Sequence, residues 1–175
     1  NSVISAEQAT ALVIIGGSDD ASAPNTVTVN SGLIISGQYA LAPAEAAGNT
    51  DAASNKWAIY APVGYTNVTI GQEGLVIGNI YLGAMSDTQG DLINHGRLIL
   101  SEAVVANNSL HNYGSIQPAG QFHIGHATVT GSLKHYSSAT IYVDIDVASG
   151  IRANDFVTVT GLALVNDEIV PETKQ

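Results

Sequence analysis

A nine-residue phrase occurs twice in this chain, as LINHGRLIL at residues 92–100 and as LHNYGSIQP at residues 110–118. Both copies read apolar, any residue, Asn, any residue, Gly, any residue, apolar, and they begin eighteen positions apart. A repeat with this alternation predicts short strands that stack in successive coils. Asn and Gly tolerate the left-handed backbone that a sharp corner needs. We therefore expect the Asn-x-Gly triplets at 94–96 and 112–114 to be corners that lie directly on each other.

Weaker copies extend the repeat toward the start of the chain, as NSGLII at residues 30–35 and GQEGLVI at residues 71–77. The corner glycines, Gly32, Gly74, Gly96 and Gly114, are spaced by 42, 22 and 18 residues. The longest spacing fits two coils, or one coil with a large insertion. Residues 42–56 contain no large apolar side chain and are the predicted inserted loop. The whole of 1–175 is then a single all-β domain of about five to seven coils.

Composition limits the classes of function. The chain has 175 residues, 45% of them hydrophobic and 11% charged, which is typical of a folded domain and not of a disordered one. The net charge of −10, with only five basic residues, argues against binding to nucleic acid or to an anionic membrane. The absence of cysteine excludes disulfides and thiolate metal sites. No apolar run is long enough for membrane insertion by this segment, and no signal peptide is visible, so we expect a processed chain or part of a larger protein.

Two local patterns predict individual elements. The sequence SAEQAT at residues 5–10 allows a short helix before the first apolar run. The sequence IYVDIDV at residues 141–147 is the clearest alternating strand. It would place Tyr142, Asp144 and Asp146 together on one face.

Four further phrases follow the second corner in a fixed order: NYGSIQPAG at 112–120, ATVTGSL at 127–133, SATIYVDI at 138–145 and NDFVTVTG at 154–161. Through these phrases, residues 92 to about 170 resemble the C-terminal part of the passenger domain of Gram-negative autotransporters, the proteins of type V secretion. Ala119 stands where the family pattern prefers Gly, and Phe156-Val157 replaces the usual pair after Asp155.

The resemblance implies a right-handed three-stranded parallel β-helix, or β-solenoid, exported through the outer membrane by a separate barrel. It implies that the section at 92–170 is autochaperone-like, folding first and templating the rest. The expected function is that of a non-catalytic stalk or adhesin at the bacterial cell surface or in secreted form, with a role in virulence. Expected partners are a host or cell-surface protein or glycan, or a second copy of the chain, and not nucleic acid.

Two alternatives stay open, a β-helical polysaccharide-processing enzyme and a self-associating filament subunit. Polygalacturonases, which share the β-helix, carry N-T-D, D-D, G-H-G and R-I-K in that order. Here N-T-D at 49–51 follows D-D at 19–20, and the last two motifs are missing. The G-D-S-G of serine proteases and the G-x-S-x-G of lipases are absent as well. We therefore expect no catalytic residue, no metal and no cofactor.

The remaining candidates are polar or aromatic side chains with an ordinary structural explanation. The histidines, His95, His111, His123, His126 and His135, are expected on the surface, with His95 and His111 stacked in neighbouring coils. Asp144 and Asp146 could bind calcium or act as acid and base, but an exposed strand face usually leaves such a pair solvated.

Three aromatic residues beside the predicted loop, Trp57, Tyr60 and Tyr65, are the candidates for a binding patch, since aromatic side chains concentrate binding energy. Their alternative role is to cap the core or to pack under the loop.

Overall fold

The structure is a computed structural model that describes residues 2–6, 10–17, 21–36, 57–83, 90–100, 103–106, 108–118, 124–146 and 153–167. The predicted loop at 42–56 lies outside these ranges. The described residues form strands and no helix, so none of them belongs to a helix long and apolar enough to cross a membrane. The helix allowed at 5–10 is wrong where it can be checked, because residues 5 and 6 lie in a strand.

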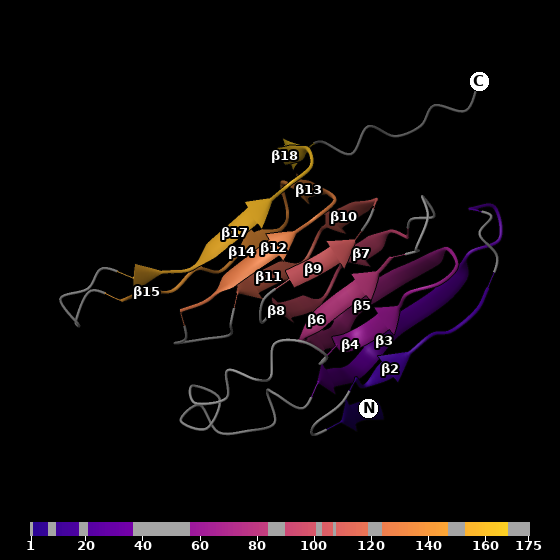
Figure 1. Ribbon diagram of the computed structural model, residues 1–175. Helices are drawn as coiled ribbons and strands as arrows, with labels where there is room; N and C mark the ends of the chain where they lie inside the picture. The colour runs from indigo at the N-terminus through magenta and orange to yellow at the C-terminus, as the bar shows by residue number, and fades with distance from the viewer. Residues whose placement is uncertain are drawn as a thin grey trace.

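The strands lie side by side along the molecule, and the colour passes from the N-terminal strands at one end to the C-terminal strands at the other (Figure 1). Neighbours within a sheet are not consecutive in the chain. Their bounds are β1 (Ser2–Ala6), β2 (Leu12–Val13), β3 (Asn25–Ser36), β4 (Trp57–Ala61), β5 (Thr66–Ile77), β6 (Asn79–Leu82), β7 (Leu92–Asn94), β8 (Arg97–Leu100), β9 (Ala103–Ala106), β10 (Ser109–Asn112), β11 (Ser115–Pro118), β12 (His126–Val129), β13 (Ser132–Tyr136), β14 (Thr140–Ile141), β15 (Ile145–Asp146), β16 (Ala153–Asn154), β17 (Phe156–Val159) and β18 (Ala163–Asp167).

The described strands form two parallel sheets and one short antiparallel pair. The larger, curled sheet runs β14-β11-β8-β5-β7-β10-β13-β18, with β3 beside β5 and β1 beside β3. The smaller runs β17-β12-β9-β6-β4-β2, and β15 pairs with β16 in antiparallel fashion. The all-β class and the parallel pairing are confirmed.

Each strand of the repeat pairs with its equivalent in the next copy. The first half of β5 pairs with β7 and its second half with β8, so that Val68 lies opposite Leu92 and Leu75 opposite Arg97. In the next step Leu92 lies opposite Leu110, and Asn94 opposite Asn112. The backbone N–H groups of Tyr113 and Gly114 donate to the Asn94 carbonyl at 2.8 and 2.9 Å. The predicted stacking of the corners at 94–96 and 112–114 is confirmed.

The core consists of columns of inward side chains that follow this register. One column is Val68, Leu92, Leu110 and Leu133, and none of the four is more than 3% exposed. The alternate residues of the same strands point outward, as the period of two requires. Burial of each large aliphatic side chain contributes about 1.5–3 kcal/mol.

A second inward column changes from apolar to polar along the molecule. It runs Val29, Ile70, Asn94, Asn112 and His135, and all five residues are buried. The Asn94 amide donates to Asn112 Oδ1 at 2.7 Å and to the Ser115 carbonyl at 3.0 Å, and its own oxygen accepts from Gly96 N at 3.1 Å. Asn112 Nδ2 lies 3.0 Å from His135 Nδ1. These buried amides therefore have hydrogen-bond partners inside the corner, as buried polar groups require.

The left-handed corner is wrong for Gly96 and Gly114. Neither belongs to the described glycines of positive φ, which are Gly16, Gly17, Gly32, Gly64 and Gly78. Glycine is required there for a different reason, the close approach of the neighbouring backbone. A Cβ on Gly114 would lie within 3.0 Å of the Gly96 carbonyl oxygen and of the backbone of His95. A Cβ on Gly96 would meet the carbonyl oxygens of Gly71 and Gly74 in the same way.

The single strand expected at 141–147 is also wrong. Strand β14 ends at Ile141, and the antiparallel β15 begins at Ile145. The cause is the buried carboxylate of Asp155, which accepts from Gly125 N at 2.7 Å and from Asp144 N at 2.8 Å. That bond removes the Asp144 backbone from the ladder, so Asp144 and Asp146 do not share one continuous strand.

Gly114→Ala should lower the free energy of unfolding by roughly 1–3 kcal/mol, because its methyl group must displace the backbone of the preceding copy. Denaturant unfolding measures the effect. Ser115→Ala, at the next position, is the control and should unfold as the wild type does. Equal stability of the two variants would contradict the close approach.

Asn112→Leu should cost about 1–3 kcal/mol for each buried partner that loses its hydrogen bond, here Asn94 and His135. Thermal unfolding of this variant can be compared with Asn30→Ala, which changes the exposed asparagine of the equivalent corner in the first copy. A melting temperature unchanged by Asn112→Leu would show that the ladder contributes nothing.

Candidate functional site

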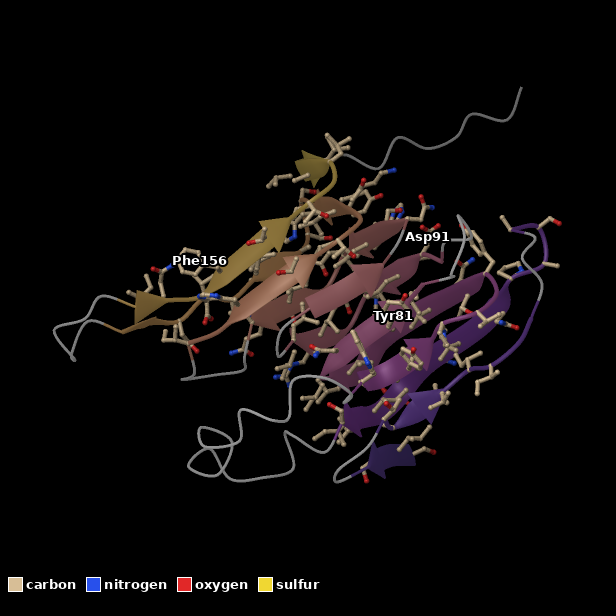
Figure 2. All side chains as sticks on the ribbon, viewed as in Figure 1. Tyr81, Asp91 and Phe156 are labelled. Atoms are coloured by element: carbon tan, nitrogen blue, oxygen red, sulfur yellow. The ribbon has the colours of Figure 1, made fainter. Side chains whose placement is uncertain are left out.

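An aromatic cluster lies on the smaller sheet and consists of Trp57, Tyr60 and Tyr81, all half-buried. Tyr60 on β4 lies opposite Tyr81 on β6, and their ring centroids are 5.2 Å apart in a stacked arrangement. The Trp57 ring lies 5.9 Å from Tyr60 and 5.4 Å from Tyr81. Tyr81 is labelled in Figure 2.

A bulge in β4 brings these rings together. Residues 57 and 60 are three apart, and an unbroken strand would place them on opposite faces. The register of β4 against β6 shifts between Trp57 and Ile59, which leaves Ala58 as the extra, fully buried residue. The bulge re-aims Trp57 to the side of Tyr60, a use typical of bulges near binding surfaces.

The structure divides the aromatic candidates of the sequence between two places. It brings Trp57 and Tyr60 together, adds Tyr81, and places Tyr65 elsewhere. The signal for Tyr81 was present in the sequence, because Ile59-Tyr60 recurs as Ile80-Tyr81 at the equivalent position of the next copy.

A polar cavity of about 370 Å³ lies on the larger sheet. Its lining comes from the outward faces of β10, β13 and β18 and from the residues just before β7 and β18, in two rows that follow the register. The lining residues are Asp91, Ser109, Ser132 and Leu162 in one row, His111, Lys134 and Leu164 in the other, and Asn108 at the rim. Asp91 is labelled in Figure 2. Sequence reasoning missed this cavity; alignment of DLIN (91–94), SLHN (109–112) and SLKH (132–135) on their leucines would have found it.

Hydrogen bonds hold the cavity's polar groups in place. Asp91 Oδ1 accepts from Asn108 Nδ2 at 2.7 Å, from Ser109 N at 3.1 Å and from Ser109 Oγ at 3.1 Å. Ser109 Oγ also lies 2.8 Å from His111 Nε2, and His111 Nδ1 lies 3.2 Å from the Tyr136 hydroxyl. The result is a continuous chain from a carboxylate to a phenol.

This chain contains Asp, Ser and His, but not in the order of a catalytic triad. In a triad the imidazole lies between the serine and the carboxylate and takes the serine proton. Here the Ser109 hydroxyl lies in the middle and donates a hydrogen bond to Asp91 Oδ1. His111 Nε2 lies on the far side of the Ser109 hydroxyl from Asp91, and His111 Nδ1 lies against the Tyr136 hydroxyl. The arrangement orients polar groups and does not activate Ser109 as a nucleophile.

Tyr65 belongs to the surroundings of this cavity. Burial and the negative charge of Asp91 raise the pKa of Tyr65 above its ordinary value of 10.0, and a hydrogen bond with the Asn108 side chain partly opposes them. The phenol thus stays neutral to higher pH than a free tyrosine.

The surface position expected of the histidines is confirmed for His95 and His126, which are exposed, and is wrong for His135. His95 stacks on Tyr113 at 4.7 Å, and Tyr113 stacks on Tyr136 at 3.9 Å, so His95 does not stack on His111. The rings of His126 and Phe156 meet edge to face with their centroids 4.9 Å apart. His135 is buried. His123 lies outside the described residues. Within the described ranges no three His, Asp or Glu side chains gather into a group that could hold a metal ion.

Comparisons of the chain with protein families, with curated proteins and with solved structures found no match. The evidence for function therefore comes from the geometry of the aromatic cluster, the polar cavity and the strand ladder.

A pH titration tests the environment of Tyr65. Because the folded pKa is raised, the unfolded chain ionises first, and Tyr65 should lower the unfolding free energy as pH rises above about 10. The difference in tyrosinate absorbance between the wild type and Tyr65→Phe isolates this group, and its midpoint should lie above 10.0. Asp91→Asn should move that midpoint down. A midpoint at or below 10.0 would contradict the assignment.

Proposed function

We propose that the chain is a right-handed three-stranded parallel β-helix that serves as a non-catalytic stalk or adhesin, as part of an autotransporter passenger at the bacterial cell surface or in secreted form. It contacts a protein or a glycan on another surface. The proposal joins the passenger-like phrases at residues 92–170 with the geometry of the strands and of the aromatic cluster.

The observation that carries the proposal is the register of the repeat. Gly32 lies opposite Gly74, and the residues that follow Gly74, Gly96 and Gly114 pair in the same register. Copies that are 42, 22 and 18 residues apart in the chain therefore occupy equivalent places in the sheet. Parallel pairing of equivalent strands, with the connections off the sheet, is how a solenoid is built. The interior of a solenoid is filled with packed side chains, so any binding or chemistry takes place on its outer face.

The proposed contact surface is the cluster of Trp57, Tyr60 and Tyr81. Three half-buried aromatic rings on one sheet offer a large, rigid contact area at a low cost in side-chain entropy. Trp and Tyr are also the residues most often found at the energetic centre of interfaces. The rings leave polar atoms at their edges, which suits a partner that has hydroxyl groups.

The positions of the acidic residues favour this function over the polysaccharide-processing enzyme. Asp155 is committed to two backbone N–H groups, Asp144 lies in the break between β14 and β15, and Asp146 lies on β15. A glycosidase needs two carboxyl groups facing each other across a substrate. The Asp155 carboxylate instead holds the backbone at Asp144, just before the β15–β16 pair.

Binding to a panel of glycans and surface proteins tests the proposal. Tyr60→Ala and Tyr81→Ala should each weaken capture about tenfold or more, since loss of a central aromatic anchor costs at least about 1.4–2 kcal/mol. Tyr142→Ala is the matched control, because Tyr142 is 56% exposed and outside the cluster, and it should bind as the wild type does.

Two results would overturn the proposal. One is equal loss of binding in Tyr142→Ala and Tyr60→Ala, which would remove the cluster as the contact surface. The other is turnover of a polysaccharide that Asp144→Asn or Asp146→Asn abolishes, which would establish the enzyme instead.

A further inference from the structure

We propose that the cavity on the larger sheet binds an acidic sugar, a ligand that combines a carboxylate with neighbouring hydroxyl groups. This site is separate from the aromatic cluster on the smaller sheet, and it does not depend on the proposed function. Its volume of about 370 Å³ lies in the range of small-molecule sites, roughly 300–1,000 Å³.

The first argument concerns Lys134. Its side chain is half-buried in the cavity wall, and no described carboxylate forms an ion pair with it. A partly desolvated ammonium without a counter-charge is unfavourable, and an anionic ligand offsets that cost. The other basic residue of the described chain, Arg97, is exposed and is not part of the lining. Among the residues that the structure describes, Lys134 is therefore the cation that can receive a ligand carboxylate in this chain of net charge −10.

The second argument concerns hydrogen bonding to hydroxyl groups. All three donors that hold the Asp91 side chain reach Oδ1, so Oδ2 keeps its acceptor capacity. The Ser132 hydroxyl has no hydrogen-bond partner among the described residues, so it can both donate and accept. The Asp91 carboxylate lies before β7 and the Ser132 hydroxyl on β13, on the two sides of β10, so each can bond a hydroxyl group of a pyranose ring placed between them.

The third argument is the spacing of the charges. Asp91 precedes β7 and Lys134 lies on β13, with β10 between them. Two strand spacings of about 4.8 Å separate their backbones by roughly 10 Å, no ion pair joins the two side chains in the described structure, and the gap leaves room for one ring. The exposed side chains of Leu162 and Leu164 complete the cavity with an apolar wall, against which the C–H face of a sugar packs.

Calorimetric titration with D-galacturonate, its methyl ester and its linear trimer tests the inference on the whole chain. The ester keeps the hydroxyl groups and loses the charge. Galacturonate should bind at least tenfold more tightly than the ester, which is about 1.4 kcal/mol. Tighter binding of the trimer would identify a residue within a polysaccharide as the natural ligand. Binding of the monosaccharide alone would identify a free sugar acid.

Two variants of the same charge change locate the binding. Lys134→Gln should weaken galacturonate at least tenfold and leave the ester unaffected, whereas Arg97→Gln should change neither by more than about twofold. Asp91→Asn keeps the Oδ1 acceptor and should weaken acid and ester alike. The inference is overturned if galacturonate does not bind at tens of millimolar, if the ester binds as well as the acid, or if Arg97→Gln has the same effect as Lys134→Gln.

Discussion

The hydrogen bond between the buried side chains of Asn94 and Asn112 is the constraint on which the rest of the structure depends. Two amides with no access to water must find each other, since an unpaired buried amide costs about 1–3 kcal/mol. They meet only when β7 and β10 pair with Leu92 opposite Leu110. A slip of one residue would break the amide contact and also turn every leucine of the column out of the core. The apolar column alone is compatible with every strand register that keeps the leucines inward. The hydrogen bond between the two amides forms in only one of those registers.

That register determines what the outer face presents. Residues one position before and one after each buried leucine point outward, so Asp91, Ser109 and Ser132 are brought into one row although they are widely spaced in the chain. Lys134 lies beside His111 for the same reason. On the smaller sheet, the pairing of Ile59 with Ile80 places Tyr60 on Tyr81. Neither the polar cavity nor the aromatic cluster is built by one loop. Both are properties of the ladder, and changes that leave the inward columns intact can alter the outer rows independently.

The sequence predicted the all-β class, the parallel stacking and the contact of the two Asn-x-Gly corners, because these follow from a period of two and an eighteen-residue repeat. It did not predict why the corner needs glycine. A side chain at position 114 is excluded by the carbonyl oxygen of Gly96, a residue of the previous copy, and no local sequence pattern reveals that neighbour. The break at 142–144 was missed for a similar reason, because the Asp155 carboxylate that causes it comes eleven residues later. Tyr81 could have been found, since Ile-Tyr repeats in register. The bulge at Ala58 could not, as it depends on pairing with β6.

The outermost strands of the larger sheet carry exposed apolar side chains, and one of these strands, β18, also contributes to the cavity. Three strands are outermost in the larger sheet as described, β1, β14 and β18. On β18 Val165 is 66% exposed and on β1 Val3 is 62% exposed, so two of these three strands present apolar side chains. An open parallel edge is a template for a further strand. In the proposed solenoid, each copy of the repeat pairs with the strand of the next copy through its parallel edge. The same kind of edge can pair with a strand from another chain. Leu164 on β18 belongs to the cavity wall, so a strand added beside it would extend that wall and enclose the space between Asp91 and Lys134 more fully.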